Sequence, residues 1–235
     1  MSGGLRCARL KFQGQQMLLD PAGALVWPDE SLLVIADLHF EKSSSGAVRG
    51  LFLPPYDTGI TLRLIEGLME RHRPRQVIAL GDSFHDRRAA ERLSGSDRLR
   101  IRALTAACDW TWVAGNHDPD APTDLGGRAA EEIAIGPVVF RHEPRPGTGL
   151  DEALGEVAGH LHPAARVVVR GRSVRCRAFA CDGRRLILPA IGAFTGGLNV
   201  LDPAFRALFP GRAFHAWMMG ETRVHPVRAG DLRPG

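Results

Sequence analysis

The chain has 235 residues, 44% hydrophobic and 24% charged, and its mean hydropathy is -0.10, values that exclude a disordered or fibrous protein. Its net charge of +4 and pI of about 9.2 suit a phosphate-rich substrate, although 28 of the 30 basic residues are arginines, a bias that genomic base composition alone could produce. No apolar run approaches the roughly 20 residues that cross a bilayer, and residues 1–16 lack the apolar core of a signal peptide, so we expect one cytoplasmic domain over residues 1–235 with no membrane segment.

Short apolar runs, each ending at polar residues or glycine, predict buried strands in the first part of the chain, at Ser31–Ala36, Gln76–Leu80, Trp110–Ala114 and Val138–Phe140. Apolar residues at helical spacing predict helices over Thr58–Arg71, with Asp57 or Thr58 as the N-cap, and over Ser96–Ala107. Ser43–Gly46 and Pro144–Gly149 are predicted to be loops. The alternation of strand and helix predicts a mainly parallel sheet with crossover helices.

After Val157 the strand-like segments follow one another closely and are separated by turn signals such as Asp182-Gly183. These segments are Val167–Val169, Arg175–Ala180, Arg185–Leu188 and Ala213–Met218. Such close spacing predicts antiparallel strands in a second sheet that packs face to face on the first. The predicted fold is therefore α/β, a four-layer α-β-β-α sandwich of two mixed β-sheets with helices outside.

The four cysteines show neither a CxxC pair nor the spacing of a zinc ribbon; they are Cys7, Cys108, Cys176 and Cys181. In a cytoplasmic chain this pattern predicts reduced thiols without a role in the mechanism. The spacing of Cys176 and Cys181 would also permit a small disulfide loop.

Residues suited to metal binding follow three of the predicted strands. Asp37-Leu38-His39 follows the first, Gly81-Asp82 the second and Gly115-Asn116-His117-Asp118 the third. Ligands bind at the carboxyl ends of strands in open α/β sheets, and a single carboxylate can bridge two cations about 3.5–4 Å apart. Taken singly, each of these motifs also fits a polar turn after a strand.

Two histidine motifs lie further along the chain, Arg141-His142-Glu143 after Val138–Phe140 and Gly159-His160-Leu161-His162 after Val157. An alternating His-x-His segment projects both imidazoles to the same side of an extended chain. Imidazole and carboxylate together suit manganese, iron or zinc, whereas calcium sites are built from oxygen ligands. The remaining histidines without such neighbours, His72, His215 and His225, are predicted to be surface or core residues.

Together these motifs resemble the motif series of calcineurin-like metallophosphoesterases. The segments LPPYDT (residues 53–58) and LPAIGAFTGGLNV (residues 188–200) further resemble the bacterial ligase-associated DNA damage response endonucleases. The resemblance implies two divalent cations, Mn²⁺ above all, with Fe or Zn as alternatives. It assigns one cation to Asp37, His39, Asp82 and His162 and the other to Asp82, Asn116, His142 and His160, so Asp82 is the bridge.

Two adjacent dications would lower the pKa of a bridging water, and the resulting hydroxide would attack phosphorus in line. His117, oriented by Asp118, is the candidate acid for the leaving group; alternatively, His117 only positions its loop. His85 takes the place of an outer support of the metal ligands and is also a candidate contact to the substrate. Candidate contacts to the substrate are Arg49, Arg87, Arg88 and Arg141 for phosphate and Tyr56, Phe40 and Phe84 for stacking on a base, although each also fits an ordinary surface or core residue.

The metal motifs alone predict hydrolysis of a phosphoester. The subfamily resemblance implies a phosphodiesterase that acts on DNA or a related nucleic acid, an endonuclease linked to DNA repair, with a DNA ligase or a helicase as partner. A phosphomonoesterase acting on a nucleotide, small metabolite or phosphoprotein is the alternative. A non-catalytic interaction module with the same fold is a third interpretation, and the complete set of motifs argues against it.

Overall fold

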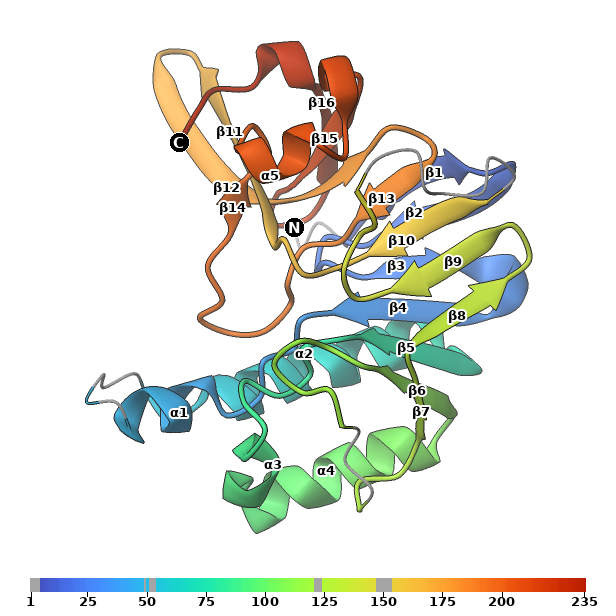
Figure 1. The fold of residues 1–235 in the computed structure, drawn as a ribbon, viewed down its shortest axis with the longest axis vertical. Helices are drawn as coiled ribbons and strands as arrows, with labels where there is room; N and C mark the ends of the chain where they lie inside the picture. The colour runs from blue at the N-terminus through green and yellow to red at the C-terminus, as the bar shows by residue number, and fades with distance from the viewer. Residues whose placement is uncertain (1–4, 49, 51–53, 121–123, 147–153) are drawn as a thin grey trace.

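Two mixed β-sheets pack face to face in the structure, a computed structural model that describes residues 5–48, 50, 54–120, 124–146 and 154–235 (Figure 1). The first sheet has the strand order β1-β2-β3-β4-β5-β6-β7. Its strands are β1 (Ala8–Phe12), β2 (Gln15–Leu19), β3 (Leu25–Trp27), β4 (Leu32–Ala36), β5 (Gln76–Leu80), β6 (Asp109–Val113) and β7 (Arg128–Ala130). Strands β1 to β4 pair antiparallel, whereas β4 to β7 pair parallel.

The second sheet has the order β14-β11-β12-β13-β10-β9-β8, with β15 and then β16 joined to β12. Its strands are β8 (Glu132–Ile135), β9 (Val138–Arg141), β10 (Gly155–Ala158), β11 (Pro163–Val169), β12 (Arg172–Cys181), β13 (Arg185–Ile187), β14 (Leu198–Asn199), β15 (His215–Met219) and β16 (Val224–Arg228). Its hairpins are antiparallel, but β10 lies parallel to both β9 and β13.

Helices cover the outer faces of both sheets (Figure 1). They are α1 (Lys42–Val48), α2 (Asp57–His72), α3 (Ala89–Arg92), α4 (Gly95–Ala106) and α5 (Pro203–Arg206), together with three 3-10 turns, η1 (Pro28–Glu30), η2 (Pro210–Arg212) and η3 (Ala229–Asp231). Buried residues of α2 and α4 pack on β4, β5 and β6, while residues in and beside α5 pack on β12 and β15. The outer layer of the second sheet thus consists of short helical turns.

A central core fills the space between the sheets. Phe12 of the first sheet and Phe140 and Phe179 of the second belong to it, and all three side chains are fully buried. Strands β4 and β5 are apolar almost throughout because one face meets this core and the other meets the helices. The predicted four-layer α-β-β-α sandwich is therefore confirmed.

Most strands and helices that the motifs require agree with prediction to within one or two residues, namely β4, β5, β6, β9, α2 and α4. The prediction of a loop at Ser43–Gly46 is wrong, because these residues lie in α1. There the Ser43 amide donates to the Asp57 carboxylate at 2.9 Å, so a tertiary contact overrides the weak helix propensity of a serine-rich segment. The predicted cap of α2 is also wrong: Tyr56 occupies the N-cap, and its side chain makes no capping hydrogen bond.

The described part of the chain contains no helix that is long and apolar enough to cross a membrane. All four cysteines are free in the structure, and Cys176 and Cys181 lie on the same strand.

Candidate metal centre

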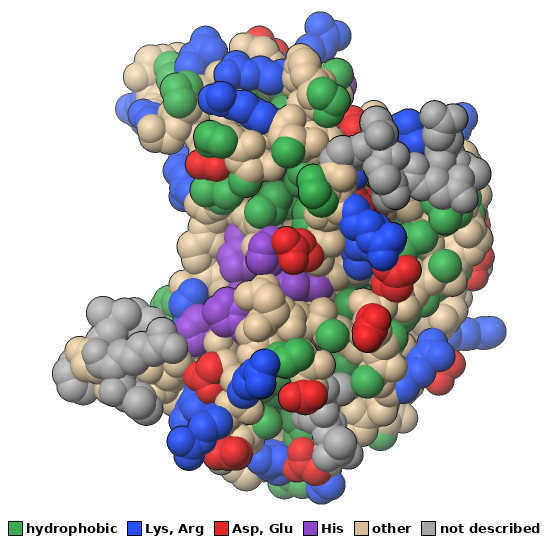
Figure 2. Space-filling model, viewed as in Figure 1, with side chains coloured by type: hydrophobic (Ala, Val, Ile, Leu, Met, Phe, Trp, Pro, Cys, Tyr) green, Lys and Arg blue, Asp and Glu red, His purple; other side chains and the backbone are tan. Residues whose placement is uncertain are grey.

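The seven predicted ligands converge at the carboxyl ends of strands from both sheets. Asp37 and His39 follow β4, Asp82 follows β5, and Asn116 follows β6 in the first sheet; His142 lies directly after β9, and His160 and His162 follow β10, in the second. Figure 2 shows the histidines gathered in a hollow between the upper and lower parts of the molecule. Because these strand ends meet at one edge of the sandwich, residues far apart in sequence come within contact distance.

The first ligand group consists of Asp37, His39 and His162. The Nε2 atoms of His39 and His162 lie 3.2 Å apart, and His162 Nε2 lies 3.5 Å from an oxygen of Asp37. Their ligand atoms all lie within 4.8 Å of one another, which is close enough to share one cation.

The second ligand group consists of Asp82, Asn116, His142 and His160. The amide oxygen of Asn116 lies 2.9 Å from His142 Nε2 and 3.0 Å from His160 Nδ1. The His142 Nδ1 atom lies 3.2 Å from the Leu80 carbonyl, which leaves Nε2 to face the centre.

Asp82 lies between the two groups. Its Oδ2 atom is 3.9 Å from His39 Nε2 in the first group and 3.4 Å from His142 Nε2 in the second. Its other oxygen accepts the His117 amide at 2.9 Å and is thereby fixed. One carboxylate oxygen therefore faces both groups, as the predicted bridge requires.

Five of the seven ligands have left-handed backbone conformations, with φ of 53° at Asp37, 44° at His39, 42° at Asp82, 67° at His160 and 44° at His162. Such conformations cost about 1–3 kcal/mol each for residues other than glycine and cluster at functional sites. The glycines before the ligands permit the close packing: a side chain at Gly81 would begin 2.2 Å from the His142 ring. At Gly159 it would begin 2.7 Å from the Asp37 carboxylate.

The electrostatics of the centre favour positive charge. Burial opposes protonation of His142, but its hydrogen bond with Asp82 and the charges of Asp37 and Asp82 raise its pKa to about 9. Burial, together with the charge of His162, lowers the pKa of His39 to about 2. Burial opposes ionisation of Asp82, yet the hydrogen bond from His142 holds the Asp82 pKa well below its usual range. The carboxylates thus attract cations, while His39 remains neutral and able to act as a ligand.

This donor set fits two divalent cations. Each group combines imidazole nitrogens with carboxylate or amide oxygens, a mixture that suits Mn²⁺, Fe or Zn. Asp37 and Asp82 are fully or almost fully buried, and a cation is the partner that repays such burial of charge.

His117 lies at the mouth of the centre with 41% of its side chain exposed, and its Nε2 atom is 3.9 Å from Asp82 Oδ2. The predicted contact between Asp118 and His117 is wrong. The Asp118 carboxylate instead accepts the Phe84 amide at 2.9 Å, and the His117 Nδ1 atom lies 2.9 Å from the His85 carbonyl. The two side chains thus have different partners: Asp118 joins two motif loops, and the His85 carbonyl holds the His117 ring.

His85 occupies the position predicted for an outer support. Its Nδ1 atom lies 3.4 Å from Nδ1 of His39, and its ring stacks on His117 with centroids 5.5 Å apart. Contacts of this kind orient the ring of a metal ligand and fix which nitrogen carries the proton.

The predicted substrate contacts divide into three kinds. Arg141 is buried and paired with Glu132 and Glu156, so its assignment as a free phosphate contact is wrong. Phe40 and Phe84 are also buried, where they pack edge to face, and neither is open to a nucleobase. The exposed residues are Tyr56, Arg87 and Arg88, whereas Arg49 lies outside the described residues.

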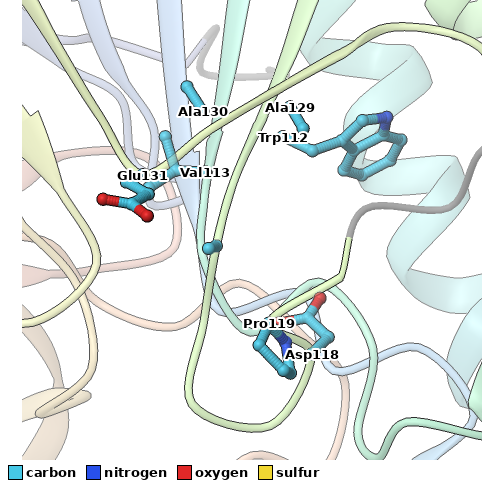
Figure 3. A pocket seen from close by; sticks show the side chains of 8 residues that line it. Trp112, Val113, Asp118, Pro119, Ala129, Ala130 and Glu131 are labelled. Carbon is cyan, nitrogen blue, oxygen red and sulfur yellow. The ribbon is translucent and has the colours of Figure 1, made fainter.

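Two hollows adjoin the motif loops. Figure 3 shows the first, of about 260 Å³, where Asp118 and Pro119 face Trp112 of β6 and Ala129 of β7. No metal ligand lines it, and burial there raises the pKa of Asp118 to about 7. The second hollow, of about 340 Å³, opens beside Asn116 and His142 and is also lined by three acidic residues, Glu131, Glu132 and Glu143.

The sequence analysis missed Glu156 on β10. Its fully buried carboxylate accepts a hydrogen bond from Arg141 at 2.7 Å and another from Arg185 at 2.5 Å. Because Arg141 immediately precedes His142, this ion network holds the strand end that carries a ligand. The sequence did contain a sign of this network, namely a charged residue within the short strand segment Gly155–Ala158, which is otherwise apolar or small.

A family model described as calcineurin-like phosphoesterase matches residues 31–177, and the chain belongs to this family. By its fold and its motifs, the protein is thus a metal-dependent phosphoester hydrolase. Among solved structures, the chain is similar to the nuclease MPE of Pseudomonas putida, with 27% identity and a TM-score of 0.73 over 94% of this chain and 100% of that one. Comparison with curated protein sequences gives no match.

Proposed function

We propose that the protein is a phosphodiesterase that cleaves DNA or a related nucleic acid, with two Mn²⁺ ions as cofactors. The observation that carries the proposal is the single Asp82 oxygen facing both ligand groups at 3.9 and 3.4 Å. Similarity to a nuclease over nearly the whole chain supports a diester substrate. Two-metal centres of this kind serve in-line displacement at phosphorus.

The residues that would hold the cations are the two ligand groups, with Asp82 shared. When bound, the cations lower the pKa of nearby water and polarise the phosphoryl oxygens. Asp37 and Asp82 also place negative charge at the base of the centre, which concentrates cations there. The ring of His142, held by the Leu80 carbonyl, stays fixed while substrate enters from the open side.

His117 is assigned the proton transfer to the leaving oxygen. Its ring reaches the mouth of the centre, and the His85 carbonyl accepts from Nδ1, so Nε2 is the atom that faces the substrate. Nε2 lies 3.9 Å from the Asp82 carboxylate, so the ring reaches the position beside the ligand groups that a general acid requires. Asp118 acts through the loop, because its carboxylate holds the Phe84 amide.

The experiment compares bis(p-nitrophenyl) phosphate, p-nitrophenyl phosphate and a single-stranded oligonucleotide with the Mn²⁺-loaded protein. Cleavage of the diester and the oligonucleotide at rates well above that of the monoester supports the proposal. Preference for the monoester would establish a phosphomonoesterase instead, and no turnover of any substrate would establish an interaction module. Asp82→Ala, purified in the same way, excludes a contaminating nuclease.

We further propose a role in DNA repair in the cytoplasm, alongside a DNA ligase or a helicase. The support is the resemblance of residues 53–58 and 188–200 to the ligase-associated endonucleases. Co-purification of tagged protein with a ligase or helicase from DNA-damaged cells tests the partner assignment.

A further inference from the structure

Two basic side chains lie near the first ligand group without a salt bridge to any described residue. Lys42 opens α1 three residues after His39, and Arg177 lies on β12. Both are partly buried. Within the described residues neither forms a salt bridge, whereas the partly buried Arg92, Arg98 and Arg100 each do.

Arg177 is anchored to a backbone segment that pairs with Asp37. Its Nη2 atom donates to the Gly192 carbonyl at 2.9 Å and to the Thr195 hydroxyl at 3.1 Å. The Gly192 amide in turn donates to the Asp37 carbonyl at 3.1 Å. These bonds use one of the guanidinium nitrogens, so other N–H groups of Arg177 have no partner among the described residues.

Lys42 lies near both Arg177 and the first ligand group. Burial lowers the pKa of Lys42, and the charge of Arg177 lowers it further, against the opposing effect of Asp57. The charge of Lys42 also contributes to the lowered pKa of His39. Burial lowers the pKa of Arg177 as well. Because Asp57 forms no salt bridge with Lys42, its charge offsets the repulsion between the two cations only in part, and an anion that joins them would be stabilised.

The other side of the centre carries mixed charge. Glu131, Glu132 and Glu143 line the hollow beside the second ligand group, but so do Arg141 and Arg145, which both pair with Glu132. In Figure 2 a blue side chain borders the purple histidines at the left edge of the hollow, whereas red and blue side chains lie together on the other side. A polyanion is therefore attracted most strongly at the first ligand group, where Lys42 and Arg177 form no salt bridge with a described residue.

We propose that Lys42 and Arg177 form a binding site for the phosphate next to the one that is cleaved, on the side of the first ligand group. The site takes a phosphodiester within a nucleic acid chain, and a guanidinium and an ammonium group together match its two non-bridging oxygens. The inference rests on the proposed nuclease function and deepens it, because it requires a substrate with at least two consecutive phosphates.

The test compares Lys42→Gln and Arg177→Gln with the wild type on a short oligonucleotide and on bis(p-nitrophenyl) phosphate, which has no neighbouring phosphate. We expect kcat/KM for the oligonucleotide to fall about ten- to hundredfold, as for loss of a hydrogen bond to a charged group. The loss on the small diester should be at least tenfold smaller. Arg172→Gln, which removes the same charge at the far end of β12, should stay within twofold on both substrates.

A substrate with one neutral methylphosphonate locates the contact. Two such substrates are compared, with the neutral linkage on one side or the other of the cleavage position. The wild type should cleave only one of them more slowly than the unmodified oligonucleotide. On that slower substrate, Lys42→Gln should cause little further loss. Lys42 makes no hydrogen bond among the described residues, so its replacement should not move the backbone or the predicted ligands. Metal binding should therefore be unchanged. Metal content measured by mass spectrometry checks this point.

Equal losses on both substrates, or wild-type rates on the oligonucleotide in Lys42→Gln and Arg177→Gln, would overturn the site. The salt dependence gives an independent reading, since each lost phosphate contact should reduce the slope of log Kd against log salt concentration by about one. If the wild type cleaves only the small diester and no oligonucleotide, the nuclease function itself fails, and that outcome differs from both of the others.

Discussion

Asp82 contacts both ligand groups and the loop that carries His117. It faces both ligand groups through Oδ2 and holds the His117 amide through Oδ1. Replacement by asparagine keeps the size of the side chain and removes the charge. If Asp82 is shared by two cations, as proposed, the centre should not retain both after that change.

For Asp82→Asn we expect the bound metal to fall from two ions per chain to one or none, and kcat/KM on bis(p-nitrophenyl) phosphate to fall more than about 100-fold, beyond the effect of an outer-shell change. Metal analysis by mass spectrometry and initial rates measure the two effects. Asp86→Asn is the control, because Asp86 pairs with Arg92 away from the ligands. Full metal content in Asp82→Asn would contradict the bridging role.

The two possible roles of His117, acid catalysis and positioning, differ in how the rate loss of a His117 variant depends on the leaving group. For His117→Ala we expect a loss of about 10²–10⁴-fold on a diester with an alkyl leaving group, but a much smaller loss with p-nitrophenolate, which leaves without a proton. Rates on both substrates at full Mn²⁺ occupancy measure the difference. Equal losses on the two substrates would assign His117 to positioning alone.

Among the elements, β9 and β10 depend on the buried network around Glu156. The Glu156 carboxylate pairs with Arg141 and Arg185 and also accepts the Arg145 amide at 3.0 Å. Arg185 continues the network to the Leu208 and Arg145 carbonyls at 2.9 and 2.6 Å. The network therefore joins the end of β9 to β13 and to the segment before η2.

For Glu156→Gln we expect the free energy of unfolding to fall by about 3–5 kcal/mol, because the buried Arg185 loses its counter-charge and the buried Arg141 keeps only Glu132. Urea denaturation measures the change. Glu132→Gln is the matched control: 45% of the Glu132 side chain is exposed, and we expect a loss of about 0–1 kcal/mol. A cost at Glu156 as small as that at Glu132 would contradict the structural role of the network.

Prediction from sequence succeeded where the determinants are local to an element. Asp37, Asp82 and Asn116 each follow a buried parallel strand, and such strand ends meet at one edge, so their convergence could be expected. The N-terminal strands β1 to β3 were missed because β1 and β2 are short and alternate with charged or polar residues, and only pairing stabilises them. The burial of Arg141 was missed because its partner Glu156 is fifteen residues away on another strand.

At the scale of the whole molecule, Asp20 joins the N-terminal strands to α2. Its fully buried carboxylate accepts hydrogen bonds from Arg71 at 2.6 Å and from the Ala22 amide at 2.8 Å, and His72 Nε2 lies 2.7 Å away. With Cys7 this group could hold a metal by distance alone, but the guanidinium of Arg71 already occupies the carboxylate. Burial opposes ionisation of Asp20, and these hydrogen bonds lower its pKa to about 2.

The lowered pKa makes part of the stability depend on pH. A carboxyl group whose pKa is lower in the folded chain stabilises it above its unfolded pKa of about 4, and this contribution is lost as the pH falls toward 2. We expect Asp20→Asn to be less stable than the wild type at pH 6 by about 1–3 kcal/mol, with the difference shrinking below pH 4. Urea denaturation at a series of pH values measures it, with the exposed Asp29→Asn as control. A difference that does not vary with pH would argue against this linkage.

The ligands come from two halves of the chain: four side chains up to Asn116 belong to the first sheet, and the three imidazoles from His142 onward belong to the second. Each bound cation would therefore link the two sheets. It would close a long loop of the chain, and it would do so only in the folded state. In this respect the cofactor resembles a reversible disulfide. Removal of the cations by a chelator would therefore abolish activity and also lower the stability of the folded chain. The contacts between the two sheets should weaken first at the edge where the ligands lie.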